Sequence, residues 1–168
     1  EYLYQLGHRK IAYLGVDNSL VFSADRRNGY QLALTRHGIV PKPEYCVELP
    51  SITAGEDTPV HALLRSASRP TAIVVSDDIL ALTLERICTE TGLSIPADLS
   101  ILSFNNSLFA RLTSPQLTSI DINSCQLGME AAAQMISHIE NPGLPATKIL
   151  VPHQLIERDS CARPASHE

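Results

Sequence analysis

Hydrophobic residues along the chain fall into short apolar runs that alternate with longer amphipathic segments. The apolar runs predict strands at 10–15, 45–49, 71–75, 97–104, 117–123 and 148–157, the last broken at Pro152. The amphipathic segments predict helices at 25–37, 53–68, 79–91 and 124–140. Strands that alternate with helices over the whole length are typical of an α/β protein with a doubly wound parallel sheet.

The boundaries of these elements carry their own signals. Thr53 and Glu56 form a capping box that begins the second helix, because the hydroxyl and the carboxylate can both bond free amides. Residues 1–7 are predicted to be the last turns of a helix that ends at Gly7, so we expect the chain to be part of a longer protein. The stretch 105–115 predicts an irregular loop, because it is too long for a simple turn.

The run 71–76 is the most informative of the predicted strands. It has no polar residue in its interior, which predicts a strand buried on both faces, as in a parallel sheet. Asp77 and Asp78 follow it directly, and the helix 79–91 comes next. Open α/β sheets bind ligands at the carboxyl ends of their strands, so we expect these two carboxylates to lie in a crevice.

Polar side chains follow three predicted parallel strands at this same edge of the sheet. Carboxylates, amides and a guanidinium suit the hydroxyl groups of a sugar, because a hydroxyl both donates and accepts and Arg can bond two neighbouring oxygens. The primary candidates for ligand binding are Arg26, Asp77 and Asn105, and the further candidates are Asp25, Asp78 and Asn106.

Each candidate also has a purely structural interpretation. Arg26 fits a solvated residue in the first turn of a helix, and Asn105 with Asn106 fits a pair of turn residues. For Asp78 the structural interpretation is the better one, since Asp at the start of a helix usually serves as its N-cap.

Two predicted helices carry more apolar surface than the sheet alone requires. In the helix 79–91, Leu80 and Leu84 share one face while Ile79 and Leu82 lie roughly opposite, so the second face needs a partner. In the helix 124–140, apolar and small residues cover over half the circumference. That helix is either central to a large core or part of a second lobe outside this chain.

Composition narrows the class of protein. At 168 residues and a net charge of −5, the chain is expected to form one domain and to make no DNA contact by itself, because phosphate binding needs clustered Lys and Arg. Four widely spaced cysteines favour reduced thiols over disulfides or a zinc site. No apolar run reaches the roughly 18 residues of a membrane span, and no signal peptide begins the chain. We expect a soluble, cytoplasmic protein.

The residues of common catalytic sites do not occur in their usual patterns. Asp77 and Asp78 resemble the acidic pocket of phosphoacceptor receiver domains, but Asn105 and Asn106 stand where a charged group is expected. The chain has no glycine-rich phosphate loop, no HExxH motif and no Gly-x-Ser-x-Gly elbow. We therefore expect neither an enzyme nor a metal or cofactor.

Six motifs, in order along nearly the whole chain, resemble the effector-binding module of LacI/GalR family transcriptional repressors. They are LGHRKIAYLG at 6–15, SADRRNGY at 23–30, VSDDILAL at 75–82, IPADLSI at 95–101, PQLTSI at 115–120 and LG at 127–128. The resemblance implies a periplasmic-binding-protein-like (type I) module of two lobes, and this chain contains mainly the C-terminal lobe. That lobe is expected to span about 9–121 and 146–161, whereas 1–7 and about 123–141 are expected in the N-terminal lobe.

The resemblance also implies roles for the candidate residues. Arg26 matches the family's sugar-contacting Arg, and Asp77 and Asp78 match its acidic pair after the third strand. Asn105 and Asn106 replace a pair of Asp, and Ile122 stands where many members have a ligand-contacting Gln. The contact of that Gln is therefore expected to be lost. The variants FNNS at 104–107 and IDIN at 120–123 look most like maltose-operon repressors of the family.

The expected function is that of a sugar-responsive repressor whose operator DNA is bound by a helix-turn-helix domain outside this chain. The resemblance further implies a homodimer, whose interface would contain Ile79, Leu82, Arg86, Phe109, Leu112 and Pro115. The alternative is a sugar-binding protein of a transport system with the same fold.

Overall fold

The computed structural model describes residues 1–16, 21–50 and 58–165. Its strands are β1 (Ile11–Val16), β2 (Cys46–Leu49), β3 (Ala72–Val75), β4 (Ser100–Phe104), β5 (Thr118–Asp121) and β6 (Gln154–Ile156). Its helices are α1 (Tyr2–Gln5), α2 (Val21–Arg36), α3 (Thr58–Arg65), α4 (Asp78–Thr91), α5 (Leu108–Leu112) and α6 (Ser124–Glu140), with a 3-10 turn at Pro43–Tyr45.

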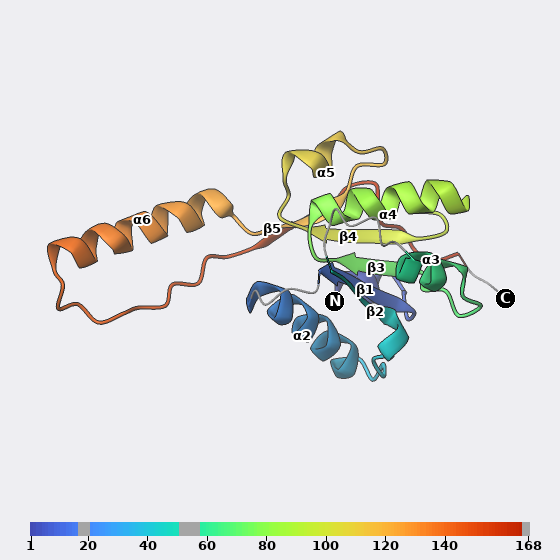
Figure 1. The fold of residues 1–168 in the computed structure, drawn as a ribbon, viewed down its shortest axis with the longest axis horizontal. Coiled ribbons are helices and arrows are strands. Elements are labelled where there is room, and N and C mark those ends of the chain that lie inside the picture. Colours follow the sequence, from blue (N-terminus) through green and yellow to red (C-terminus); the bar gives the residue numbers. More distant parts are fainter. Residues whose placement is uncertain (17–20, 51–57, 166–168) are drawn as a thin grey trace.

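The six strands form one sheet in the order β2-β1-β3-β4-β5-β6. Strands β1 to β5 pair in parallel, and only β6 runs antiparallel to its neighbour β5. Helix α2 lies on one face of the sheet, and α3, α4 and α5 lie on the other (Figure 1). The predicted α/β fold with a mostly parallel sheet covered on both faces is confirmed.

Alternating residues of the strands belong to two separate apolar clusters, one on each face of the sheet. Ala12 and Leu14 of β1 pack with α3 and α4, in a cluster that includes Val60, Leu80 and Leu84. Ile11 and Tyr13 of the same strand point to the opposite face, where they pack with Tyr30 and Leu34 of α2. Because successive side chains of a strand point to opposite faces, a central strand that is apolar throughout must be covered twice.

The first helix belongs to the second of these clusters. Leu3 of α1 is buried there with Ile11 and Tyr30. Leu3 thus packs on the same sheet as α2 does, and the assignment of residues 1–7 to a second lobe stays a prediction.

Several predicted boundaries are wrong for identifiable reasons. Residues 97–99 are not strand: 97 and 98 belong to a turn, and the Asp98 carboxylate accepts a 2.8 Å hydrogen bond from the backbone amide of Ser94. The predicted loop 105–115 contains the short helix α5. Of the predicted strand 148–157, only β6 meets a partner strand. The predicted capping box of Thr53 and Glu56 lies outside the described residues.

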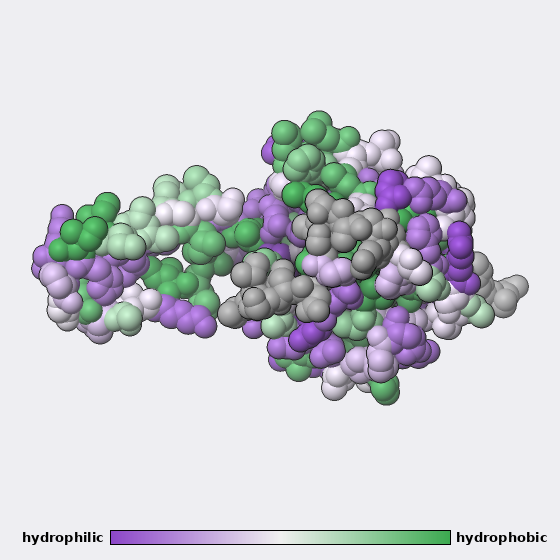
Figure 2. All heavy atoms as spheres, in the orientation of Figure 1, coloured by the Kyte–Doolittle hydropathy of each residue, from purple (hydrophilic) through white to green (hydrophobic). Residues whose placement is uncertain are grey.

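Helix α6 and the chain that returns beside it, 141–153, project away from the sheet as an arm (Figure 1). No residue of α6 is buried. Met135, Ile136 and Ile139 expose 64%, 56% and 70% of their surfaces, and apolar surface recurs along the arm (Figure 2). The prediction that α6 is central to a large core is therefore wrong, and the alternative of a second lobe stays open.

Within the described ranges, no helix has both the length and the apolar character to cross a membrane. The same residues include no group of three or more His, Cys, Asp or Glu side chains that could hold a metal ion.

Candidate functional site

The carboxyl ends of β3 and β4 and the start of α2 surround a cavity of about 520 Å³. Polar and apolar side chains line it together: Phe22, Arg26, Asp77, Asp78, Ile79, Asn105, Ser107, Phe109, Ile122 and Leu127. The three primary candidates from the sequence, Arg26, Asp77 and Asn105, are thus brought together at one edge of the sheet. Their role in ligand binding stays a prediction.

Arg26 is the only Lys or Arg among the described residues that line this cavity, and its position is fixed on several sides. Its guanidinium lies 5.1 Å from the centroid of the Phe22 ring and 4.7 Å from that of Phe104, within range of cation–π attraction. Nη1 donates to the backbone oxygen of Ser76 at 2.5 Å, and Nη2 donates to Oδ1 of Asn105 at 3.0 Å. The side chain is therefore held in place before any ligand arrives.

Burial has an electrostatic consequence for Arg26. Desolvation lowers the pKa of its guanidinium, and the nearby Tyr13, Asp77 and Asp78 act in the opposite direction. Because an Arg remains protonated at neutral pH even after a modest decrease, the cavity presents one fixed positive charge. A partly desolvated charge of this kind interacts more strongly with ligand oxygens than an exposed one.

Asp77, and not Asp78, is the N-cap of α4. Its Oδ1 accepts a 2.8 Å hydrogen bond from the amide of Leu80. The prediction that Asp78 takes this role is wrong by one residue, because helix geometry already begins at Asp78. The remaining oxygen of Asp77 has no partner among the described residues, so it is free to accept from a ligand.

Asp78 is almost completely buried, with 1% of its surface exposed. Its Oδ1 accepts from the hydroxyls of Ser103 and Ser119 at 2.6 and 2.8 Å, and its Oδ2 accepts from the amide of Ser107 at 2.6 Å. A carboxylate that already accepts three hydrogen bonds has little capacity left for a ligand. Asp78 therefore joins β4, β5 and the loop before α5, and its contacts within the protein suit a positioning role.

Asn105 and Asn106 are adjacent in sequence but point to different places. Both have positive φ angles, 98° and 47°, a conformation that Asn tolerates better than most residues. Asn105 faces Arg26 in the cavity. Asn106 turns away and contacts Asp121 and Arg158 at the base of the arm.

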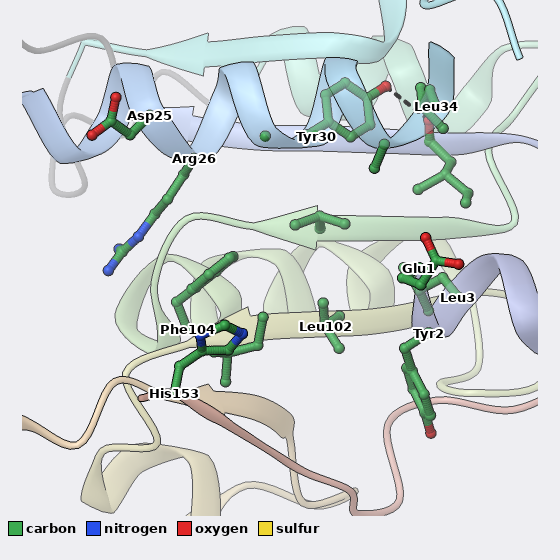
Figure 3. A pocket seen from close by; sticks show the side chains of 15 residues that line it. Glu1, Tyr2, Leu3, Asp25, Arg26, Tyr30, Leu34, Leu102, Phe104 and His153 are labelled. Carbon is green, nitrogen blue, oxygen red and sulfur yellow. Dashed lines mark hydrogen bonds between the residues drawn. The ribbon is translucent and has the colours of Figure 1, made fainter. Parts of the chain in front are cut away.

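Asp25 is exposed and borders a different, larger cavity of about 630 Å³. This second cavity lies over the α2 face of the sheet, between α2 and α1, and its wall includes Tyr30, Phe104 and His153 (Figure 3). The Tyr30 hydroxyl donates to the backbone oxygen of Ile11 at 2.9 Å, which fixes one side of the wall. Asp25 does not border the 520 Å³ cavity, and the structure does not group it with Asp77 and Asn105.

The residues of the expected dimer interface lie on α4, on α5 and in the turn that follows α5. Ile79, Phe109 and Leu112 expose 45%, 44% and 69% of their surfaces, which leaves an apolar surface beside the cavity. Leu82 and Pro115 are half-buried, and the exposed Arg86 donates to Glu90 at 2.5 Å on its own helix. Ile79 and Phe109 also line the cavity, so this surface and the candidate site are continuous.

Sequence reasoning missed three residues of this region. Phe22 lies before residue 25, where the helix was predicted to begin, so the sequence pattern did not place it one helical turn from Arg26. Ser107 lines the cavity, and its hydroxyl is buried with no hydrogen-bond partner in the described part of the chain. Arg158, which donates to Asn106 at 2.6 Å, lies 52 residues further along the chain, and only the fold brings the two together.

The comparisons with known proteins agree with this architecture. The ribose operon repressor of Haemophilus influenzae is 32% identical over 140 residues, which are 83% of this chain and 42% of the repressor. A LacI transcriptional regulator from Bacillus cereus subsp. cytotoxis has a crystal structure that matches with a TM-score of 0.90 at 36% identity, over 98% of this chain and 58% of that one.

A LacI family regulator from Enterococcus faecium, crystallised with bound ribose, matches with a TM-score of 0.84 at 28% identity, over 98% of this chain and 60% of that one. The chain spans about half the length of the curated relatives it matches. The model of the periplasmic binding protein-like domain matches residues 1–161. The chain thus belongs to the family of periplasmic-binding-protein-like domains, and the relatives it resembles are transcriptional regulators of the LacI family.

Proposed function

We propose that this chain is the effector-binding part of a LacI-family repressor of sugar utilisation, and that its effector is a sugar bound in the 520 Å³ cavity. The observation that carries the proposal is the setting of Arg26, which two aromatic rings and two hydrogen bonds hold at the cavity wall. A guanidinium has five N–H groups, and the described residues engage two of them, so the others can donate to neighbouring hydroxyls of a sugar.

The remaining polar groups of the cavity complement Arg26. The free oxygen of Asp77 accepts from a sugar hydroxyl, and the amide nitrogen of Asn105 donates to one. Phe22, Phe109 and Ile122 supply apolar surface for the carbon face of the ring. The bound ribose of the Enterococcus faecium regulator supports a sugar as the ligand class. Maltose is the first disaccharide to test, because residues 104–107 and 120–123 predict a resemblance to maltose-operon repressors.

In the whole protein, we infer, residues 1–7 and about 123–141, which include α6, belong to a second, N-terminal lobe, and the sugar binds between the lobes. The exposed apolar residues of α6 support this arrangement. Closure of the lobes changes the geometry of a helix-turn-helix domain outside this chain, which binds operator DNA in the cytoplasm. Differential affinity of the sugar for the two conformations is what makes such a switch possible.

We further propose that the whole protein is a homodimer. Its interface would be the apolar surface formed by α4 and α5, with Leu82 near the centre and Ile79, Arg86, Phe109, Leu112 and Pro115 around it. Two-fold interfaces are self-complementary, and paired operator half-sites require two DNA-binding domains at a fixed spacing.

The test is a binding screen on the full-length protein. Ribose, maltose and other mono- and disaccharides are titrated by calorimetry, and operator DNA release is followed at each sugar concentration. We expect one sugar class to bind and to change DNA affinity. Sugar binding without any DNA-binding activity would favour the alternative, a sugar-binding protein of a transport system, and absence of binding by every sugar would contradict the proposal.

A further inference from the structure

Three polar side chains and one backbone amide at the base of the arm form one hydrogen-bonded group, which we call the hinge cluster: the side chains of Asn106, Asp121 and Arg158 and the backbone amide of Asn123. Two segments join the arm to the sheet, one leaving at the end of β5 and the other returning into β6 (Figure 1). Asp121 ends β5, and Asn123 directly precedes α6. The hinge cluster therefore lies where the direction of the arm is decided.

Asn106 holds the hinge cluster together through both ends of its amide. Its Nδ2 donates to Oδ2 of Asp121 at 2.9 Å, and its Oδ1 accepts from Nη2 of Arg158 at 2.6 Å. An acidic partner on one side and a basic partner on the other fix the orientation of this amide. Each bond joins the amide to a charged group, and such bonds are stronger than neutral ones.

Asp121 connects Asn106 to the first residues of the arm. Its second oxygen, Oδ1, accepts a 2.7 Å hydrogen bond from the backbone amide of Asn123. Asn123 has the left-handed conformation, φ 53° and ψ 52°, which sets the direction in which α6 leaves the sheet. The hydrogen bonds from Asn106 and Asn123, together with the charge of Arg158, lower the pKa of Asp121, so this carboxylate is charged at neutral pH.

The segment that contains Asn106 also contacts the candidate sugar site. Oδ1 of Asn105 accepts the 3.0 Å hydrogen bond from Arg26 in the cavity, and Asn106 is the next residue. The backbone amide of Asn105 donates to the backbone oxygen of Ile120 at 2.8 Å, and the backbone amide of Asn106 donates to Oγ of Ser119 at 3.0 Å. Residues 105 and 106 are thus fastened to the last residues of β5, with one side chain in the cavity and the other in the hinge cluster.

We propose that Asn106 is a positioning residue that couples ligand binding at Arg26 and Asn105 to the direction of the arm. The inference rests on the proposed function for its ligand. Arg26 already holds the side-chain oxygen of Asn105, and a sugar hydroxyl that accepts from the side-chain nitrogen of Asn105 draws on the other end of the same amide, so the side chain of Asn105 must adjust. Because Asn105 and Asn106 adopt consecutive positive φ angles, an adjustment of one changes the backbone of the other and hence its bonds to Asp121 and Arg158.

The experiment compares Asn106→Ala and Asn106→Asp with the parent in the full-length protein. The Ala variant loses both bonds of the amide, whereas the Asp variant retains an acceptor for Arg158 but places a like charge beside Asp121. Asn28→Ala, at an exposed position of α2, is the matched control. The readouts are hydrogen–deuterium exchange of amides 123–128 without sugar, sugar affinity by calorimetry, and the fold-change that saturating sugar causes in operator affinity.

We expect exchange of these amides to become roughly 10-fold faster in both Asn106 variants, as the loss of a charge-assisted hydrogen bond predicts. Amides of α2 and α4 should exchange as in the parent, and sugar affinity should change by less than about 3-fold, because Asn106 does not line the cavity. The effect of sugar on operator affinity should shrink by about 10-fold, within the usual range of allosteric coupling.

Two results would overturn the inference. One is unchanged exchange at 123–128 in both Asn106 variants, and the other is an unchanged effect of sugar on operator affinity. A parent protein that binds no sugar contradicts the proposed function instead. In that case the exchange measurement, which needs no ligand, still decides whether Asn106 sets the direction of the arm.

Discussion

The guanidinium of Arg26 donates a 3.0 Å hydrogen bond to the side-chain oxygen of Asn105, although 79 residues separate the two in sequence. Arg26 stands in the first turns of α2 and Asn105 directly follows β4, so their contact joins α2 to the carboxyl end of β4. Parallel strands bring their carboxyl ends to the same edge, which is why residues so distant in sequence can meet there.

Replacement of Arg26 by Ala should weaken sugar binding by about 10- to 100-fold, because hydrogen bonds to a charged group contribute more than neutral ones. Arg26→Lys should recover little, since an ammonium cannot reproduce the planar fork of a guanidinium. Titration calorimetry of the full-length variants measures the effect. Arg27→Ala is the control, because Arg27 pairs with Glu48 at 2.8 Å and does not line the cavity. Equal losses in the Arg26→Ala and Arg27→Ala variants would disprove a specific contact by Arg26.

Much of the fold could be predicted from the sequence, because the apolar strands and the amphipathic helices repeat with clear periods. Helix α5 could not, since its five residues are too few to show a helical period. The antiparallel direction of β6 was also not predictable, because it depends on how the arm returns to the sheet. The three residues of β6 do not themselves indicate a pairing direction.

The candidate site was predictable in part. The positions of Arg26, Asp77 and Asn105 after predicted strands were enough to place them together. The separate roles of neighbours were not predictable from spacing. Positive φ angles send Asn105 and Asn106 in different directions, and the donors to Asp78 come from residues 25 to 41 positions further along the chain.

Asp78→Ala should destabilise the fold by about 3 kcal/mol or more, because it leaves two buried hydroxyls and one amide without their acceptor. Urea denaturation followed by circular dichroism measures the change. Asp77→Ala removes one capping bond and should cost only about 1 kcal/mol. If the two variants lose the same stability, the network around Asp78 contributes no more than a helix cap does.

Glu85 should make stability depend on pH. Burial raises the pKa of its carboxyl to about 7, and its Oε1 is buried without a hydrogen-bond partner among the described residues. The folded state therefore holds a proton that the unfolded state has already lost, and stability should fall as the pH rises from about 4.5 to about 7.

Glu85→Gln should remove this dependence. Because the side chain is only half-buried and solvent screens it, we expect the variant to exceed the parent by about 1 kcal/mol at pH 7.5 and to match it near pH 4.5. Denaturation at a series of pH values tests this, with Glu44→Gln as the control at an exposed position. A parent with the same pH profile as Glu85→Gln would show that Glu85 titrates as an ordinary carboxyl.

Leu82→Asp should convert the full-length protein from a dimer into folded monomers. Ile79, Phe109 and Leu112 are exposed on α4 and α5, and a second copy of the same surface would cover them. A carboxylate placed near the centre of that interface would meet its own copy across the two-fold axis, and burial of two like charges is costly. Sedimentation velocity measures the oligomeric state, and circular dichroism confirms that the monomer is folded.

The control for charge insertion is Leu32→Asp, since Leu32 exposes 51% of its surface on α2, on the opposite face of the sheet. This variant should remain a dimer. A second explanation for the apolar surface on α4 and α5 is contact with another part of the same chain. Dimers that persist in Leu82→Asp would favour that explanation, because an interface between two copies of this surface could not tolerate the buried charges. A parent that is itself monomeric would favour it as well.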